Sequence, residues 1–384
     1  MNATHRHYTA RQYAMHVADA IETKHVKIGR IALVIPAHNE SLVIAHTIRS
    51  AMMAGLAPRD IYVVDDASND NTSKIAKSIL GRHNVLRVRR SGKGVAIKKI
   101  ATALLLTKRY RWIHVADADG EFDEHYFVEL RKHLRVTSAA ATGYVTSLSG
   151  GYISKYRTFE YAIGMDIIRR FQNIAKVITI IPGPTSIFRN DVFDKVNFSD
   201  NALCEDFDVT LQIHRNKLGS IRFIPSAIAR TQDPATFNDF IRQISRWNRG
   251  VLQMFFKHKI GLRASRIDAY LSYQVLQNLL FFLMYFIWIP VVTYISGSSA
   301  YLALSFVSDV LLIFGFTLFA ASRTGQYSII PAFPIIYAMR WVSLLIFVRS
   351  FIEVVILGRY RHSLGLWETV ARRAQATTKK IRVS

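Results

Sequence analysis

Four short apolar segments in the first third of the chain constrain its fold more than any other feature. They cover residues 31–35, 61–64, 85–88 and 112–115, are rich in β-branched or aromatic residues, and are each followed by a stretch with helical periodicity. Strands that alternate with helices in this way are typical of a parallel sheet with helices on both faces. The sequence therefore predicts an α/β domain whose ligands bind beyond the carboxyl ends of its strands.

Polar residues follow each predicted strand, at the edge where such a sheet binds its ligands. In chain order they are His38, Asn39 and Glu40; Asp65 and Asp66; Ser91 to Gly94, with Lys93 between two glycines; and Asp117 and Asp119. Turn chemistry explains any one of these clusters, because Asp, Asn, Ser and Gly favour turns. Four clusters at consecutive strand ends instead predict one shared binding site.

The segment from Trp112 to Gly120 ends in two carboxylates one residue apart, Asp117 and Asp119. Residues i and i+2 of an extended chain point to the same side, so the two carboxylates can face one point. Mg²⁺ or Mn²⁺, held by carboxylates together with substrate phosphates, removes the repulsion between them. The alternative is a polar exit from the strand, in which Asp119 and Gly120 form a turn.

The second and third clusters suit a nucleotide diphosphate. Asp65 or Asp66 can accept a hydrogen bond from a uracil imide or a ribose hydroxyl, or can instead cap the helix that follows Ala67. Lys93 between its glycines can approach a phosphate closely, or can stand in an ordinary basic turn. The chain has neither a Gly-X-Gly-X-X-Gly sequence nor a Walker loop, which excludes these two phosphate-binding motifs.

Two later motifs supply candidates for the chemical step. Asp206 follows Glu205 at the start of a predicted helix, where it can act as a general base or simply favour the helix N-terminus. Gln243, Arg246 and Trp247 are three and four residues apart and share one helix face. They can bind a diphosphate and stack on a sugar, or form a solvated face with one buried tryptophan.

The charge balance predicts an anionic partner. The chain has 50 Lys and Arg residues against 27 Asp and Glu, a formal net charge of +23, which suits nucleic acid, an anionic membrane or phosphorylated substrates. Nucleic-acid binding does not explain the acidic strand ends, so we expect no nucleic-acid partner. The single cysteine, Cys204, excludes an intramolecular disulfide and a multi-cysteine metal site.

The composition becomes apolar after residue 265. Residues 270–295 and 300–321 each reach the ~20 residues that span a bilayer, so we predict two transmembrane helices, with buried core helices as the alternative. Residues 1–30 carry Tyr13, Val17 and Ile21 at four-residue spacing, which predicts an amphipathic helix. We therefore expect a multi-pass protein of the cell membrane, with a lipid bilayer as a partner.

Basic residues flank the predicted spans. They precede the first span and fill the tail after residue 357, which places both ends in the cytoplasm and requires an even number of crossings. Residues 327–357 are apolar but contain charges, and 31 residues are too few for two full crossings at ~1.5 Å per residue. We predict a re-entrant or interfacial segment, kinked near Pro331 and Pro334, with Arg340 and Arg349 facing protein, headgroups or a polar path.

The ordered motifs resemble those of family 2 glycosyltransferases. They are PAHNE at 36–40, VVDDASND at 63–70, GKGVA at 92–96, DAD at 117–119, ED at 205–206 and QISRW at 243–247. The last element is similar to the QxxRW motif of membrane-bound cellulose, chitin, hyaluronan and poly-N-acetylglucosamine synthases. The resemblance covers roughly residues 31–250 and is more specific for the family than for the substrate.

The resemblance implies a GT-A, Rossmann-like nucleotide-sugar domain, which we place over residues 31–265, with a membrane part after it. Composition and charge give the membrane region bounds of 266–357 and a basic cytoplasmic tail over 358–384. The implied reaction is an inverting, metal-dependent transfer from a nucleotide sugar, a UDP-sugar, to a growing polysaccharide at the cytoplasmic membrane face. The alternative is transfer of a single sugar to a lipid carrier or another membrane acceptor.

The residues implied by the resemblance are Pro36, Glu40, Asp66 and Lys93 around the nucleotide, Asp117 and Asp119 around the diphosphate and metal, Asp206 as base, and Gln243, Arg246 and Trp247 over the donor diphosphate and the acceptor. Three positions depart from the family pattern. Cys204 replaces the usual Thr before Glu-Asp, Lys98 stands where Asn is common, and Gly120 follows the DAD motif.

Overall fold

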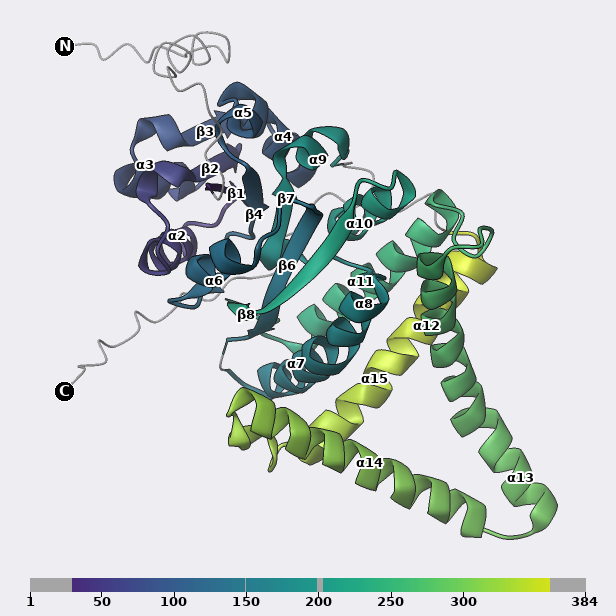
Figure 1. Cartoon of the computed structure of the whole chain (residues 1–384). Coiled ribbons are helices and arrows are strands. Elements are labelled where there is room, and N and C mark those ends of the chain that lie inside the picture. The colour runs from purple at the N-terminus through teal and green to yellow at the C-terminus, as the bar shows by residue number, and fades with distance from the viewer. Residues whose placement is uncertain (1–29, 149, 199–202, 360–384) are drawn as a thin grey trace, which may run out of the picture.

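The computed structural model describes residues 30–148, 150–198 and 203–359 (Figure 1). The predicted N-terminal amphipathic helix, with Tyr13, Val17 and Ile21, and the basic tail from residue 360 lie outside the described residues. An α/β domain is followed by long apolar helices that extend away from it. The α/β class predicted from the sequence is confirmed.

The four predicted strands form one half of an eight-stranded sheet. They are β1 (Ile31–Ala37), β2 (Ile61–Asp66), β3 (Val85–Val88) and β4 (Trp112–Val115). They run parallel to one another in the order β3-β2-β1-β4. The strand order reverses between β1 and β4, and the crevice beyond the carboxyl ends at such a point is where α/β sheets bind ligands.

The other half of the sheet departs from the predicted parallel arrangement. It contains β5 (Glu121–Phe122), β6 (Ser138–Ser147), β7 (Ser186–Arg189) and β8 (Ser220–Thr231), and the order continues β4-β7-β6-β8-β5. β7 is antiparallel to β4 and β6, and β5 is antiparallel to β8, whereas β6 and β8 are parallel. The sheet is mixed because the regular alternation of strand and helix ends after β4.

Helices cover both faces of the sheet, as predicted. Along β1, Ala32 and Val34 belong to one apolar cluster, whereas Ile31, Leu33 and Ile35 belong to the other. The first cluster includes α4 (Lys93–Ala103), α5 (Leu106–Arg109), α9 (Asn190–Lys195) and α10 (Glu205–Arg215); the second includes α2 (Ile44–Met53), α3 (Thr72–Leu80) and α6 (Tyr126–His133). This burial on both faces holds the strands, and hence the loops at their ends, in fixed positions.

Two helical segments at the edge of the sheet lie between it and the apolar helices (Figure 1). The first runs through α7 (Tyr152–Ile163), the π-helical stretch η3 (Gly164–Arg169) and α8 (Arg170–Ala175). The second is α11 (Phe237–Lys257), whose first turn is capped because the Thr236 hydroxyl accepts a hydrogen bond from the Asp239 N–H at 3.2 Å. The second segment confirms the helix predicted from the spacing of Gln243, Arg246 and Trp247.

Three helical segments are long and apolar enough to cross a membrane, by length and composition. The first joins α12 (Arg266–Leu283), the π-helical stretch η5 (Met284–Trp288) and α13 (Ile289–Ser296). The second is α14 (Ala300–Thr324), and the third joins α15 (Phe333–Phe351) to the π-helical stretch η7 (Ile352–Ile356). The first two correspond to the predicted spans, and no residue of the most apolar window in the first is buried.

Residues 327–357, predicted to be kinked near Pro331 and Pro334, do not form one continuous helix. The short 3-10 helix η6 (Tyr327–Ile329) is followed by a turn that includes Pro331, and α15 begins at Phe333. Pro334 lies in the first turn of α15, where its missing N–H costs no helical hydrogen bond, so the helix continues to Phe351. The re-entrant or interfacial position of this segment stays a prediction. Arg340 does face protein, since its guanidinium contacts the Asp309 carboxylate of α14, whereas Arg349 pairs with Glu353 on its own helix at 2.9 Å.

Polar contacts fix the helical hairpin of α12, α13 and α14 to the domain at both ends. Arg215, in the last turn of α10, donates to both carboxylate oxygens of Asp268 in α12, at 2.6 and 2.7 Å. Arg323, near the end of α14, pairs with Asp166 of η3 at 3.0 Å. In Figure 1 the two legs of the hairpin and α15 form a triangle, with the α15 side against the domain.

Candidate active site

Asp117 and Asp119 follow β4 at the point where the strand order reverses. The Asp117 side chain is 28% exposed, and Asp119 is 4% exposed. Gly183, in the Pro-Gly-Pro turn before β7, lies so close that a Cβ atom there would stand 2.5 Å from Asp117 Oδ2. Gly183 was not predicted as a site residue, although glycine is common where the backbone approaches another group closely.

Lys93 connects the end of β4 to the start of α10. Its Nζ lies 2.9 Å from Asp117 Oδ1 and 2.6 Å from Glu205 Oε1. Burial alone would lower the pKa of Lys93, but the Asp117 and Glu205 carboxylates raise it well above its ordinary value. Lys93 therefore stays charged and links two acidic motifs that are 88 residues apart, since 205 − 117 = 88. Sequence reasoning gave Glu205 no role of its own.

Asp206 lies beside this ion-pair network in the first turn of α10. Its Oδ1 accepts a hydrogen bond from the Phe207 N–H at 2.9 Å. Burial, and then the neighbouring Glu205 carboxylate, raise the pKa of Asp206 to about 7. A carboxyl group with this pKa can accept a proton near neutral pH, which is what a general base requires.

A short bridge ties Asp206 to the loop that carries Gly183. The Thr210 hydroxyl donates to the Asp206 carbonyl at 2.6 Å and accepts from the Ile181 N–H at 2.9 Å. Two residues after Ile181, Gly183 contacts Asp117. The position of the candidate base is thus coupled to the position of the candidate metal ligand through ordered backbone.

The donor set at Asp117 and Asp119 fits a hard divalent cation. Both groups offer carboxylate oxygen, which Mg²⁺ and Mn²⁺ prefer. Among the described residues, no group of three or more His, Cys, Asp or Glu side chains is arranged to hold a metal ion. A cation here would need further oxygen ligands from a substrate phosphate and water, which is how Mg²⁺ is commonly held beside phosphorylated substrates. The metal role of the two residues stays a prediction.

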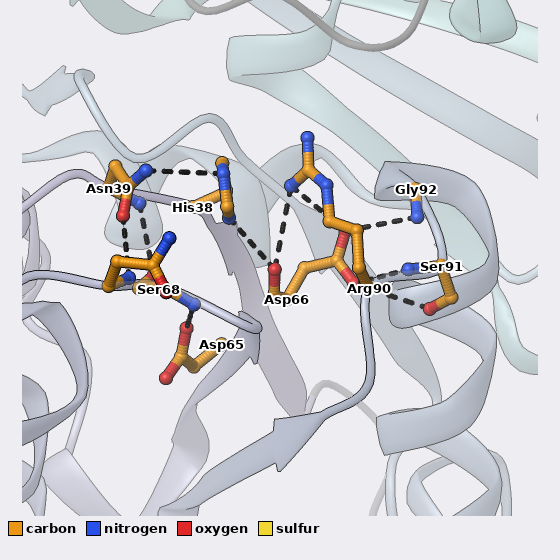
Figure 2. Close-up of polar contacts among 9 residues, drawn as sticks. His38, Asn39, Asp65, Asp66, Ser68, Arg90, Ser91 and Gly92 are labelled. Atoms are coloured by element: carbon orange, nitrogen blue, oxygen red, sulfur yellow. Dashed lines mark hydrogen bonds and ion pairs between the residues drawn. The ribbon is translucent and has the colours of Figure 1, made fainter.

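Asp66, at the end of β2, is fully buried and holds the loop after β3 (Figure 2). Its Oδ1 accepts from the Ser91 N–H at 2.7 Å, and its Oδ2 accepts from the Gly92 N–H at 3.0 Å. Arg90 pairs with the same carboxylate at 3.3 Å. Asp66 thus sets the shape of the loop that leads into Lys93, and its predicted contact with the nucleotide remains a prediction.

Asp65 and the end of β1 form a matching arrangement on the other side (Figure 2). Asp65 is also fully buried, and its Oδ1 accepts from the Ser68 N–H at 2.8 Å. The Ser68 hydroxyl in turn accepts from the Asn39 N–H at 3.0 Å, and His38 Nδ1 lies 2.8 Å from the Asp66 carbonyl oxygen. The ends of β1 and β2 are therefore joined by side chains in the first two polar clusters.

Two non-glycine residues in these loops have a left-handed backbone conformation. Asn39 has a φ of 56° and Ala67 a φ of 59°, both in the left-handed region. Pro36 is buried inside β1, and Glu40 is 1% exposed. The Glu40 N–H donates to the Thr72 hydroxyl at 2.8 Å. The structure thus brings the predicted nucleotide-side residues to one edge of the sheet, with Pro36 inside the strand.

α11 carries the remaining predicted residues. The Oε1 atom of Gln243 is buried and has no hydrogen-bond partner among the described residues, so it is available to a donor group on a ligand. Trp247 is half-buried, and the Arg157 guanidinium of α7 lies over its ring at 4.9 Å from the centroid. Arg246 is also half-buried. The cation beside Trp247 was not foreseen from the sequence.

Two of the departures from the family pattern have clear structural settings. Cys204 is buried, with its Sγ 3.8 Å from the Trp247 carbonyl oxygen, and a Cβ added to Gly250 would lie 2.4 Å from that sulfur. Cys204 therefore packs tightly against α11 beside Trp247. Lys98 points elsewhere: its ammonium group contacts the Phe193 carbonyl and lies 4.5 Å from the Phe193 ring centroid.

The chain is similar in sequence to known glycosyltransferases. A model of the glycosyltransferase-like family 2 matches residues 29–250. The "probable glycosyltransferase YdaM" of Bacillus subtilis is 27% identical over 319 residues, which cover 76% of this chain and 73% of that protein. The poly-beta-1,6-N-acetyl-D-glucosamine synthase of Staphylococcus epidermidis is 24% identical over 239 residues, 60% of this chain and 56% of the synthase.

A solved structure shares the fold at low sequence identity. It is a mannosyltransferase from Pyrobaculum calidifontis in complex with GDP-Man and Mn²⁺, and it aligns with a TM-score of 0.55 at 15% identity. The alignment covers 85% of this chain and 93% of that protein. The likeness supports a common GT-A architecture.

Proposed function

Because the chain belongs to family 2 of the glycosyltransferases and is a glycosyltransferase of the GT-A fold, we propose that it transfers sugar from a UDP-sugar to a growing polysaccharide with inversion. The observation that carries this proposal is the meeting of Lys93, Asp117, Glu205 and Asp206 at the carboxyl edge of the sheet. One positive and three acidic groups, one of them with a pKa near neutrality, suit a diphosphate donor and a hydroxyl acceptor.

The donor would bind across the ends of β1, β2 and β4. Pro36, Glu40, Asp65 and Asp66 line the nucleotide side, and Lys93 approaches the diphosphate. Asp117 and Asp119 would hold Mg²⁺ or Mn²⁺, which neutralises charge that develops on the leaving diphosphate. A donor phosphate would compete with the Asp117 and Glu205 carboxylates for Lys93, so we expect Lys93 to change partners when the donor binds.

Asp206 would act on the acceptor. It takes the proton from an acceptor hydroxyl while the hydroxyl oxygen forms a bond to the anomeric carbon. The bond between that carbon and the diphosphate oxygen breaks on the opposite face, so the configuration inverts and the nucleoside diphosphate leaves. The Arg246 guanidinium, three residues after Gln243 on the same helix, supplies positive charge for the leaving group.

α11 would hold the acceptor over the donor. Gln243 has an unpaired buried oxygen that can accept from a sugar hydroxyl, and the Trp247 indole offers a surface for a sugar ring. The named relatives that make poly-beta-1,6-N-acetyl-D-glucosamine support a polymer as the product. Transfer of one sugar to a lipid carrier is the second candidate, favoured by the close attachment of the domain to apolar helices.

The proposed membrane arrangement rests on the basic residues beside the spans and on the contacts of the apolar helices. We infer that α12, η5 and α13 cross the bilayer outward, that α14 returns, and that the catalytic domain lies in the cytoplasm. α15 packs along α7 and α11 through an apolar cluster that includes Ile336, Met339 and Ile346, and Ser343 lies 2.9 Å from the Tyr156 hydroxyl. A helix bound to the domain along its length suits an interfacial position better than a third crossing.

Cysteine labelling tests this topology in intact cells with a membrane-impermeant reagent. In a Cys204→Ser background, Ser299→Cys, at the tip of the hairpin, should be modified from outside. Leu357→Cys, just beyond η7 and 54% exposed, should be modified only after the membrane is opened. Modification of Leu357→Cys from outside would show three crossings.

The reaction is tested with membranes that contain the protein. Radiolabelled UDP-sugars and GDP-sugars are supplied one at a time with Mg²⁺ or Mn²⁺, and the products are separated by size and by solubility in organic solvent. A polymer made from a UDP-sugar supports the proposal. A single sugar on a lipid favours the second candidate, and the absence of nucleotide release with every donor contradicts both.

A further inference from the structure

Arg157 of α7 is a buried cation that touches the acceptor side of the proposed site. It is 5% exposed, and its guanidinium carbon lies 4.9 Å from the Trp247 ring centroid and 4.5 Å from that of Tyr161. Cation–π contacts of this length are attractive, and more so away from water. Because one face of the Trp247 indole is covered by Arg157, a sugar ring that stacks on Trp247 must use the other face.

The direction of the Arg157 side chain is fixed by several partners. Its Nη1 donates to Glu160 at 2.6 Å and its Nη2 donates to the Tyr161 hydroxyl at 2.7 Å. Its Nε lies 3.8 Å from the carboxylate of Asp233, just after β8. The nitrogen atoms at the edge of the planar guanidinium therefore contact residues of α7 and of the loop after β8. Its flat face contacts the Trp247 indole.

The same turn of α7 is joined to the apolar helices. Tyr156, one residue earlier, contacts Ser343 of α15 at 2.9 Å, and Thr158, one residue later, donates to Gln326 between α14 and α15 at 3.3 Å. Three consecutive residues thus connect α7 to α15, to Trp247 and to the end of α14. This turn of α7 therefore contacts both the apolar helices and the tryptophan on the acceptor side of the proposed site.

Stability alone is a weak explanation for a charge in this position. Buried ion pairs gain little over apolar packing, because both charges lose their hydration. Neighbouring apolar residues of α7 and α11 already form a cluster with α14 and α15. An apolar side chain at position 157 would pack with them, whereas the arginine combines a flat face on the indole with donors that fix its own orientation.

We propose that Arg157 is a positioning residue, which orients the Trp247 indole so that the face opposite Arg157 receives the acceptor saccharide. This inference rests on the proposed function. Arg157 acts through Trp247 and touches neither the donor nor the reacting atoms. Its loss should therefore weaken use of the acceptor while sparing binding and hydrolysis of the donor.

The test is a double-mutant cycle on the full-length protein in membranes. Arg157→Gln, Trp247→Ala and the double variant are compared with wild type for KM of an acceptor oligosaccharide and for donor hydrolysis without acceptor. We expect Arg157→Gln to raise the acceptor KM about tenfold, the size of effect expected for a desolvated cation–π contact. Donor hydrolysis should stay within twofold, and in the Trp247→Ala background the substitution should have no further effect.

Arg109→Gln provides a matched control. Arg109 also lies over an aromatic ring, 5.4 Å from the Tyr110 centroid, but on α5 rather than beside α11. It should leave the acceptor KM unchanged. If Arg157→Gln fails to accumulate, Arg157→Lys, which keeps the charge and loses the planar fork, is measured in the same cycle and should show a smaller shift in acceptor KM.

Two results would overturn the inference. Equal losses of donor hydrolysis and of acceptor use would show a general structural role for Arg157. Additive effects of Arg157→Gln and Trp247→Ala would show that Arg157 does not act through the indole. Absence of transfer by the wild-type protein with every donor would instead count against the proposed function, so the two failures are distinguishable.

Discussion

The carboxylates on the two sides of the site are held by different kinds of partner. On the nucleotide side, Asp65 and Asp66 are fully buried and accept hydrogen bonds from backbone N–H groups of the loops after β2 and β3, in addition to their ion pairs with Arg87 and Arg90. Across the site, Asp117 and Glu205 are partly exposed and share one flexible side chain, Lys93. Backbone amides cannot leave without unfolding a loop, whereas a lysine side chain can turn to a new anion. The first arrangement therefore fixes shape, and the second leaves groups available to a substrate.

The sharpest way to test this contrast is to remove the cation that Asp117 and Asp119 are predicted to hold. EDTA should abolish sugar transfer, and Asp119→Asn should lower it by about 10³ or more, since charge on the leaving diphosphate would be left uncompensated. Thermal unfolding of Asp119→Asn should match wild type. Full activity in the chelator, measured as nucleotide release, would remove the metal from the proposed mechanism.

A somewhat smaller loss is expected at the base. Asp206→Asn should lower turnover by about 10² or more, because the amide cannot accept the acceptor proton, and should leave UDP affinity within a few-fold of wild type. Asp208→Asn is the matched control on the same helix. Asp208 is buried and contacts Lys257 at 2.8 Å and His258 at 2.6 Å, so its loss should lower thermal stability and spare turnover of the folded protein. Collapse of nucleotide affinity in Asp206→Asn would make it a binding group.

The pH profile tests the same group in the unmodified protein. Because burial raises the pKa of Asp206 to about 7, the fraction of ionised base falls as the pH drops below 7. We expect kcat/KM to fall about tenfold per pH unit on the acid side, and the residual activity of Asp206→Asn to lack this limb. If kcat/KM stayed constant over about two pH units below the pKa of Asp206, the base would be a different group.

The smallest expected effect concerns folding rather than turnover. Asp66→Asn replaces an acceptor of two backbone N–H groups, so it should lower the free energy of unfolding by about 1–3 kcal/mol. Asp117→Asn should change the free energy of unfolding by less than about 1 kcal/mol. Lys93 would still pair with Glu205, and the repulsion between neighbouring carboxylates would be smaller. Thermal unfolding of both variants in the same detergent gives the comparison. Equal shifts would show that the two sides of the site do not differ in kind.

The parts of the fold that depend on local pattern were predictable from the sequence. The segments at 31–35, 61–64, 85–88 and 112–115 are strands, because short β-branched runs between stretches of helical periodicity are typical of α/β sheets. Three of them are buried throughout, whereas β3 lies at the sheet edge and is only partly buried. The antiparallel half of the sheet was not predicted. Its strands follow long connections, and pairing between segments distant in sequence leaves no local signal.

The site was predictable at the level of motifs and less so at the level of contacts. Asp117, Lys93 and Asp206 do converge, as their positions at strand and helix ends suggested. Glu205 on Lys93, Gly183 against Asp117 and Arg157 over Trp247 join residues from distant parts of the chain. Such contacts depend on how elements pack together, which residue spacing along one element does not specify.

The eleven-residue helix α10 carries the candidate base in its first turn and Arg215 in its last, and Arg215 is bound to Asp268 at the root of the first apolar segment. At ~1.5 Å per residue, about 14 Å of rigid helix separates the two. A flexible tether would give a spread of such distances. In the proposed reaction, the candidate base would therefore stand at one fixed distance from the start of the first apolar segment.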